Sequence, residues 1–387
     1  MLDSPLLGRV RLGHAPLLDR QRSVVATRLT VTPERADAPP EAVALLGLLA
    51  DVWPAEPGPR GPALMLNMAS EAWLDAVLGA LDDWRPWLEV PAFLAADAVR
   101  AQALAAYADG GGVLVLRGRP VQPLPGALQG RFQHVIVEQA GAARPGEPAP
   151  IGEFDGTLAA LDAGFQRGAP LMLGWPLADP EPATARPMPS DVQVAIELMD
   201  RLRREEPLDK LEAVLSKDAT LAFRLLRYLN SPAFGLSVEI SSLRHALQML
   251  GYQRLGRWLA LLLASASKEP AMRPLMYAAT RRGLLLEAFS SDAEMRGELF
   301  ICGIFSLLDR MLRQPFAELF KSVPVPQRVQ QALQDGSGPF QPYLELVRAV
   351  EGGAALDLRE AGERLMLGAS EINRALLNAL LVARQLD

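Results

Sequence analysis

The hydrophobic pattern of this chain changes at a proline-rich stretch, and this change constrains the fold more than any other feature. Residues 179–189 read Asp-Pro-Glu-Pro-Ala-Thr-Ala-Arg-Pro-Met-Pro. Before this stretch, short apolar runs alternate with helical stretches; after it, apolar residues recur at helical spacing. Proline lacks an amide donor and restricts the residue before it, so the stretch is typical of an extended linker. The sequence therefore predicts two domains, residues 1–178 and 190–387, joined by a linker over 179–189.

The first domain has the pattern of a parallel sheet covered on both faces. Near-continuous apolar runs separated by helical stretches indicate such a sheet. Strands are predicted at 9–12, 24–31, 63–67, 87–90, 113–116, 134–137 and 171–173. Six or seven strand–helix units fit in this domain, whereas a full β/α barrel typically needs about 250 residues. We therefore predict a reduced β/α barrel.

The second domain is predicted to be entirely helical. Apolar residues recur three and four positions apart near its start and near its end, as expected for one face of a helix. These stripes comprise Val192, Ala195, Ile196, Met199 and Leu202, and then Ile372, Ala375, Leu376, Ala379 and Leu380. No strand-like run comparable to those of the first domain follows residue 190.

Composition limits the possible partners and compartment. Half of the 387 residues are hydrophobic and 22% are charged, which suffices for two buried cores. A net charge of −6 disfavours a nucleic-acid protein, because phosphate binding needs a cationic face. The single cysteine, Cys302, lies in an apolar run and is expected to be a buried small residue in a reducing compartment. The longest apolar run, Trp258–Ala264, is shorter than the roughly 18 residues that span a bilayer, and no secretory signal is recognised, so we expect a cytoplasmic protein that does not enter a membrane.

Residues typical of catalysis or metal binding are sparse. His14, His134 and His245 are far apart in the sequence, and none has a His or Cys partner at metal-ligand spacing. The run Gly110–Gly112 is predicted between a helix and a strand, the reverse of the order in a phosphate-binding loop. The arginine pair at 281–282 is expected on a solvated helix face, as is the pair at 203–204.

The opening of the chain resembles that of EAL domains, which hydrolyse cyclic di-GMP with divalent metals. The segments that carry the resemblance are Gly13–Asp19 and Val24–Leu29. In this alignment Ala15 stands where the family has glutamine, and Arg28 stands at the position of a metal-binding glutamate. A guanidinium cannot ligate a cation, so the resemblance implies a lost ligand.

Later EAL motifs are partly kept and partly lost. Asn67 and Glu89 match two ligand positions, and Gly152-Glu153 matches a late glutamate motif. An expected pair of aspartates is replaced by Leu116-Arg117-Gly118-Arg119, and Glu138 follows a strand that lacks the family's lysine. Two-metal hydrolysis needs several converging carboxylates. The resemblance therefore implies a degenerate EAL-like barrel in which Asn67 and Glu89 serve the structure of the strand ends.

The helical half resembles HDOD domains. Residues 215–235 are similar to the signature helix and turn of that family, and residues 240–251 to its next helix. Asp218 suits a helix start, and Pro232 and Gly235 suit a turn. The signature positions are Asp218, Arg224, Asn230, Ser231, Pro232, Gly235, Ser242 and Gly251.

HDOD domains are relatives of the metal-dependent HD phosphohydrolases, whose His-Asp pair is absent here. The corresponding stretch is Gly303–Asp309, with serine and leucine at the metal-binding positions. Asp309 is expected to cap a helix or form an ion pair on the surface. Contacts with a partner are expected from apolar groups near the signature turn, namely Phe234, Tyr252 and Trp258.

The favoured function is that of a non-catalytic signalling regulator with no catalytic residue, metal or cofactor. In this reading the HDOD helices bind signalling proteins of unknown identity and the barrel is an inactive scaffold or sensor. The alternative is a receptor that binds cyclic di-GMP or another nucleotide without hydrolysing it. Its phosphate contacts would be Arg28, Arg117 and Arg119, which are predicted at strand ends. A third possibility is a phosphodiesterase with substituted ligands, and the small number of clustered carboxylates argues against it.

Overall fold

A computed structural model of the chain describes residues 4–54, 62–80, 84–143, 145–182, 190–215, 242–264 and 270–384. The chain forms two compact units. The barrel unit comprises residues 1–179 and 348–378, and the helical unit comprises residues 180–347 and 379–387. Each unit is described by itself below.

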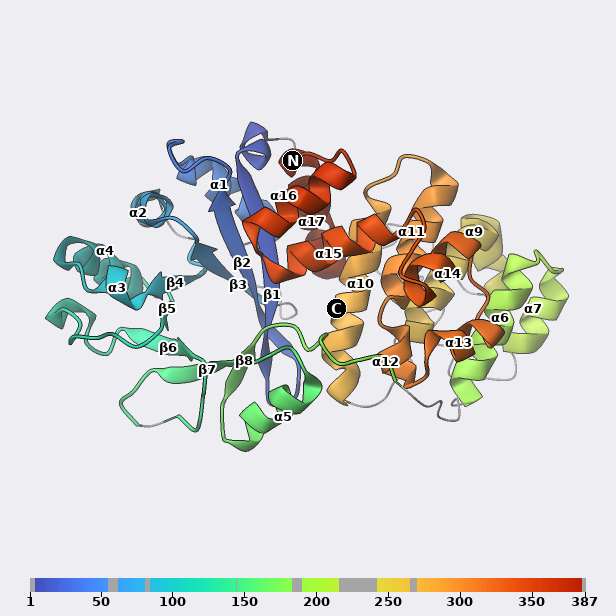
Figure 1. Ribbon diagram of the computed structural model, residues 1–387, viewed down its shortest axis with the longest axis horizontal. Helices are drawn as coiled ribbons and strands as arrows, with labels where there is room; N and C mark the ends of the chain where they lie inside the picture. The colour runs from blue at the N-terminus through green and yellow to red at the C-terminus, as the bar shows by residue number, and fades with distance from the viewer. Residues whose placement is uncertain are drawn as a thin grey trace. The chain divides into compact units, whose positions relative to one another are not determined.

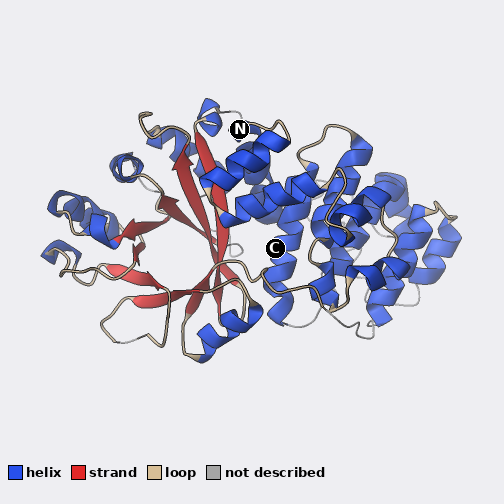
Figure 2. Ribbon diagram, in the orientation of Figure 1, coloured by secondary structure: helices blue, strands red, loops and turns tan. Residues whose placement is uncertain are grey.

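The barrel unit is built on a closed eight-stranded barrel (Figures 1 and 2). β1 is antiparallel to both of its neighbours, β2 and β8, and every other neighbouring pair is parallel. The strands are β1 (Val10–Asp19), β2 (Val24–Pro33), β3 (Ala63–Met68), β4 (Trp87–Pro91), β5 (Leu114–Arg117), β6 (Phe132–Val137), β7 (Ala149–Glu153) and β8 (Leu171–Leu173). The predicted fold class, a β/α barrel followed by a helical region, is confirmed.

The reduction of the barrel affects its helices and leaves its strands complete, so the prediction of six or seven units was too low. The strand missing from the prediction is β7, which contains Pro150 and Gly152, two residue types that are depleted in strands. Among the described residues, only a short 3-10 turn, Gly126–Leu128, joins β5 to β6, and no helix joins β6 to β7. The helices that follow other strands are α1 (Ala42–Val52), α2 (Glu71–Ala80), α3 (Ala92–Ala95), α4 (Ala98–Asp109) and α5 (Leu158–Gln166).

The barrel interior is filled by an apolar layer. Because side chains alternate along a strand, every second residue points inward. This layer contains Leu17, Ala26, Met65, Val115, Ile136, Ile151 and Leu173, all buried. Since β2 to β8 run parallel, residues two positions further along these strands form the next layer towards the carboxyl ends. That layer contains charged and amide side chains.

The remaining described elements are helical. They are α6 (Ser190–Arg203), α7 (Leu208–Leu215), α9 (Leu243–Ala264), α10 (Arg273–Glu287), α11 (Ala293–Phe305), α12 (Leu308–Leu312), α13 (Phe316–Ser322), α14 (Gln327–Gln334), α15 (Gln341–Gly352), α16 (Ala355–Arg364) and α17 (Ala369–Arg384). Residues 348–378, which span the end of α15, all of α16 and most of α17, group with the barrel. The boundary near residue 179 agrees with the predicted end of the first domain, but the region 190–387 is divided between the two units.

In the helical unit, α10 and α11 pack at close range. A Cβ atom added to Gly303 would lie 2.5 Å from the backbone nitrogen of Gly283, so only glycine fits there. Cys302 is buried beside this contact, as predicted. Arg281 and Arg282 are only 3% and 5% exposed, so the expectation of a solvated arginine pair was wrong. Close packing of α10 against α11 leaves this side of α10 no access to solvent.

No single described helix is long and apolar enough to cross a membrane. One bent pair, α16 with α17, meets the length and composition requirements only when the two helices are taken together.

Candidate functional site

A row of four charged side chains crosses the barrel interior above the apolar layer. We call it the charge ladder, and it consists of Arg28 on β2, Glu89 on β4, Arg117 on β5 and Glu153 on β7. Arg28, Arg117 and Glu153 lie two positions beyond Ala26, Val115 and Ile151 of the apolar layer, respectively. Glu89 lies two positions beyond Trp87, which packs against the apolar layer. Strand alternation therefore directs all four side chains inward at a similar height.

Glu89 is the centre of the ladder. Its side chain is fully buried, and both of its oxygens accept hydrogen bonds from guanidinium groups. Arg28 donates from Nε to Oε2 at 2.5 Å and from Nη2 to Oε1 at 2.8 Å, which is the bidentate geometry typical of strong arginine–carboxylate pairs. Arg117 donates from Nη1 to Oε1 at 3.2 Å. The buried carboxylate is therefore neutralised by two cations.

The outer half of the ladder is partly open to solvent. Arg117 Nη2 lies 3.1 Å from Oε1 and 3.4 Å from Oε2 of Glu153. The side chains of Arg117 and Glu153 are 38% and 35% exposed. Burial alone would lower the pKa of Arg117, but the charges of Glu89 and Glu153 outweigh burial and raise it. Arg117 therefore remains charged and links the buried carboxylate to the exposed one.

Asn67 has a structural role at the edge of this layer. It pairs in register with Thr30 on one side and Glu89 on the other, and its Nδ2 donates to Thr30 Oγ1 at 3.2 Å. This hydrogen bond joins the neighbouring strands β2 and β3. For Glu89 the strand-end interpretation was incomplete, because its carboxylate is the common partner of two arginines.

The divalent metals implied by the EAL resemblance do not fit this arrangement. In the EAL alignment Arg28 takes the position of a ligand glutamate, and it donates two hydrogen bonds to Glu89, which that alignment places at another ligand position. Within the described ranges, no group of three or more His, Cys, Asp or Glu residues is placed to hold a metal ion. The carboxylate oxygens that a metal would need are bonded to guanidinium groups instead.

Of the three arginines predicted to contact phosphate, the structure brings two together. Arg28 and Arg117 share Glu89, whereas Arg119 is exposed beyond the end of β5 and forms no ion pair within the described part of the chain. The sequence carries a signal for this pairing. Arg28, Glu89, Arg117 and Glu153 alternate in sign, and each follows an apolar strand residue by two positions.

The three histidines lie apart. His14 packs edge-on against Trp175, and His134 stacks on Trp87 with ring centroids 5.1 Å apart. Burial lowers the pKa of His134, although a hydrogen bond with the backbone of Ala149 acts in the opposite direction. His245 is near the start of α9, where its backbone N–H donates to Ser242 Oγ at 3.1 Å.

Most of the predicted HDOD signature lies outside the described residues. This applies to Asp218, Arg224, Asn230, Ser231, Pro232 and Gly235, and also to Phe234. Ser242 caps α9, and Gly251, with φ of +72°, interrupts this helix, which agrees with a predicted helix that ends at glycine. Tyr252 is half-buried, and its hydroxyl donates to the carbonyl of Glu206 at 3.2 Å, so its polar end is used inside the helical unit.

Asp309 is buried rather than on the surface, so the predicted surface role was wrong. It is 2% exposed, and its Oδ1 has no hydrogen-bond partner. Burial raises its pKa to about 6, the neighbouring Arg310 opposes this rise, and the charge of Glu181 adds to it. Glu181 itself accepts a hydrogen bond from the backbone N–H of Phe316 at 2.7 Å. The last position of the stretch Gly303–Asp309 is therefore a buried acid with a raised pKa.

Comparison with known proteins identifies one domain. Residues 188–308 match the HDOD domain family. The chain is 25% identical over 212 residues to YuxH, an uncharacterized protein of Bacillus subtilis, a match covering 53% of this chain and 51% of YuxH. It is 30% identical over 147 residues to CdgJ of Vibrio cholerae, named as a cyclic di-GMP phosphodiesterase, a match covering 37% of this chain and 34% of CdgJ. The matches thus span about half and about one third of these relatives. Residues 188–308 form an HDOD domain. This domain, together with the similarity to CdgJ, indicates a signalling role.

Proposed function

We propose that this protein is a non-catalytic regulator of bacterial signal transduction that acts through protein–protein interaction. In this proposal the HDOD domain binds signalling partners in the cytoplasm, and the EAL-like barrel is an inactive scaffold or sensor. The HDOD match and the name of the relative CdgJ support a place in cyclic di-GMP signalling.

The observation that carries the proposal is the pairing of Glu89 with two arginines. A hydrolytic barrel of the EAL kind needs carboxylates that are available to metal ions. Here the two carboxylates of the ladder face two guanidinium groups, so the four charges sum to zero. A divalent cation would have to displace Arg28 from a bidentate bond and would meet two fixed positive charges nearby.

A second candidate function is that of a non-hydrolysing receptor for cyclic di-GMP or another nucleotide. The observation that favours it is the 38% exposure of the Arg117 side chain at the carboxyl end of β5, where a phosphate could reach the guanidinium. The neutrality of the ladder works against it, because a phosphate must compete with Glu153 for Arg117.

Calorimetric titration of the full chain with cyclic di-GMP, with and without Mg²⁺ or Mn²⁺, separates these functions. The regulator proposal expects no heat of binding and no product in any condition. Metal-independent binding that is lost in Arg117→Gln and kept in Arg119→Gln would establish the receptor function. Arg119 is a matched control because it lies two residues away and outside the ladder. Metal-dependent loss of cyclic di-GMP would overturn the non-catalytic assignment.

Partner binding by the HDOD domain needs a separate test. The full chain is used as bait for proteins of the source bacterium, and each captured protein is then purified and titrated against it. We expect a Kd that rises at least tenfold in Phe234→Ala, near the signature turn, and is unchanged in Val121→Ala. Val121 is a fully exposed apolar residue of the barrel unit and is therefore a suitable control. A partner that loses affinity only for Val121→Ala would place recognition on the barrel.

A further inference from the structure

The hairpin formed by β1 and β2 is covered by helices from the far end of the chain. Most of β1 is buried, including Leu12 and Gly13, which lie next to each other along the strand. A strand buried on both faces needs a covering element on its outer side. Residues 348–378, with α16 and most of α17, belong to the same compact unit as the hairpin.

Asn373 of α17 is the main polar anchor of this cover. Its side chain is 1% exposed, and its Oδ1 accepts a hydrogen bond from the backbone N–H of Leu12 at 3.1 Å. Its Nδ2 donates to the carbonyls of Leu7 and Val10 at 2.8 and 2.7 Å. The two donors of the amide group and its oxygen are thereby all used. These three hydrogen bonds join the buried amide to the backbone of β1 and of the turn before it. They therefore fix α17 at one position along β1.

A glycine pair brings the backbones of β1 and α15 into contact. A Cβ atom added to Gly13 would lie 2.5 Å from Cα of Gly353 and 3.2 Å from the carbonyl oxygen of Val350. Both of these are backbone atoms, which cannot move aside as a side chain would. Gly353 ends α15 with φ of +71°, a conformation that side-chain-bearing residues rarely adopt. Any larger residue at position 13 must separate the helix from the strand.

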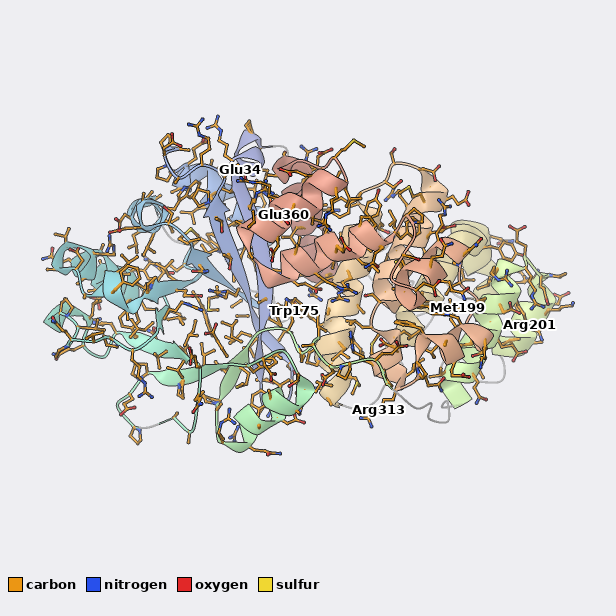
Figure 3. All side chains as sticks on the ribbon, viewed as in Figure 1. Glu34, Trp175, Met199, Arg201, Arg313 and Glu360 are labelled. Atoms are coloured by element: carbon orange, nitrogen blue, oxygen red, sulfur yellow. The ribbon has the colours of Figure 1, made fainter. Side chains whose placement is uncertain are left out.

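Charges and a small contact extend the interface at its ends. Glu34, labelled in Figure 3, follows β2. It accepts hydrogen bonds from Arg11 at 2.9 Å and from Arg359 of α16 at 3.3 Å. Gly8, next to β1, and Ser370, at the start of α17, are near enough that a Cβ atom on Gly8 would lie 3.9 Å from Cβ of Ser370. The interface thus has a buried anchor, a close backbone contact and a charged edge.

We propose that the outer face of the β1–β2 hairpin is a docking surface whose occupant is the chain's own segment 348–378, and that this docking couples the barrel to the helical unit. The two helices at the ends of the segment, α15 and α17, each continue into residues assigned to the helical unit, 341–347 and 379–384. Because each helix is continuous across the boundary between the units, a displacement of its part in the helical unit also moves the part that contacts β1. This inference goes beyond the proposed function, and its test requires no partner protein.

The first test introduces a disulfide between hairpin and cover in the full chain. The pair Gly8→Cys with Ser370→Cys has the Cβ separation of natural disulfides, roughly 3.5–4.5 Å. We expect nearly complete cross-linking under mild oxidation, seen as a mobility shift in non-reducing electrophoresis. Gly47→Cys with Ser370→Cys is the control, because nothing lies within 4 Å of a Cβ atom on Gly47. Failure of the first pair to cross-link, or equal cross-linking of both pairs, would overturn the docking.

The second test weakens the anchor and follows hydrogen exchange along the chain. Asn373→Ala leaves three backbone groups without partners. We expect amide exchange in peptides covering residues 10–19 and 369–378 to accelerate at least tenfold, and exchange in α10 to stay unchanged. Asn378→Ala is the matched control, since Asn378 lies on the same helix and is exposed. Unchanged exchange at 10–19 would overturn the docking role of Asn373, and acceleration over the whole chain would show one cooperative fold in place of a separate docking contact.

The third test addresses coupling. Oxidation of the Gly8→Cys, Ser370→Cys pair should slow exchange at 369–378 and also at 379–384, the part of α17 assigned to the helical unit. Reduction should restore both rates. Slowing that ends at residue 378 would overturn the coupling and leave the cover as a local part of the barrel.

Discussion

The two units bury a carboxylate in opposite ways. In the barrel, Glu89 has no exposed surface, and two arginines hold its oxygens. In the helical unit, Asp309 is almost as deeply buried, but its Oδ1 has no partner and its pKa is raised to about 6. A buried charge is tolerated only when it is paired or neutralised by a proton. The barrel thus pairs its buried carboxylate with two cations, whereas burial in the helical unit shifts its acid towards the protonated form.

The largest expected effect comes from removing one partner of the paired carboxylate. Arg28→Ala should lower the free energy of unfolding of the barrel by about 3–5 kcal/mol, because Glu89 keeps only the longer bond from Arg117. Urea unfolding followed by tryptophan fluorescence measures this loss. The signal reports on the barrel, since Trp258 is the only one of six tryptophans outside residues 1–179.

Two variants control for this result. Arg35→Ala removes a well-exposed ion pair with Asp37 and should cause no measurable change. Arg28→Met with Glu89→Leu removes the buried pair together and should recover most of the lost stability. If the double variant is as unstable as Arg28→Ala, packing rather than charge explains the effect.

The next effect has the opposite sign and concerns Asp309. Between its ordinary pKa of 3.8 and its raised pKa of about 6, Asp309 binds more protons in the folded than in the unfolded state. Its contribution to stability is therefore full below about pH 4 and is lost as the pH rises to about 6. Asp309→Asn should raise the free energy of unfolding at pH 7.5 by up to about 3 kcal/mol and remove this slope. Hydrogen exchange in α11 and α12 at pH 4.5 and 7.5 measures this change in stability. If Asp309→Asn is less stable than the unchanged protein at pH 7.5, the ionised form of Asp309 has a stabilising partner.

A smaller effect tests whether the two units unfold separately. Met366 after α16 and Glu205 after α6 both adopt the left-handed conformation, with φ of +54° and +51°. Each closes its helix with backbone hydrogen bonds of the kind that usually involve glycine. Met366→Gly and Glu205→Gly should each add about 0.5–1 kcal/mol to the stability of its own unit. Differential scanning calorimetry detects which transition moves, and a shift of both transitions by either variant would contradict separate unfolding.

The smallest effect is a pH dependence of the barrel opposite to that of Asp309. Burial lowers the pKa of His134, so between this pKa and the ordinary value of 6.5 the unfolded state binds more protons. The barrel should therefore lose stability as the pH falls below 6.5, whereas the helical unit gains stability as the pH falls below about 6. The backbone hydrogen bond with Ala149 acts against burial and so reduces the net effect. Fluorescence-detected unfolding at pH 7.5 and 5.5 measures this pH dependence. His134→Phe keeps a ring against Trp87 and should remove the pH dependence. If the dependence is unchanged in His134→Phe, other groups cause it.

Much of the fold could be predicted from local patterns. Apolar runs located most strands, and the stripe from Ile372 to Leu380 gave a buried helix face, because periodicity depends only on neighbouring residues. β7 was missed because Pro150 and Gly152 oppose the strand pattern, and the closed barrel overrides that preference. The burial of Arg281, Arg282 and Asp309 could not be read locally, since it depends on which helix packs against each face.

The sequence by itself determined which side chains enter the barrel interior. Arg28, Glu89, Arg117 and Glu153 each lie two positions beyond an apolar inward-facing residue, and strand alternation fixes their direction. Only the tertiary structure decided what these side chains do, because barrel closure brings four strands together and pairs two arginines with two carboxylates. It likewise decided that residues 348–378 belong with the barrel, since Asn373 finds its partners more than 350 residues earlier in the chain. Periodicity is a property of neighbours in sequence, whereas neutralising a charge or covering a strand requires partners that only folding brings near.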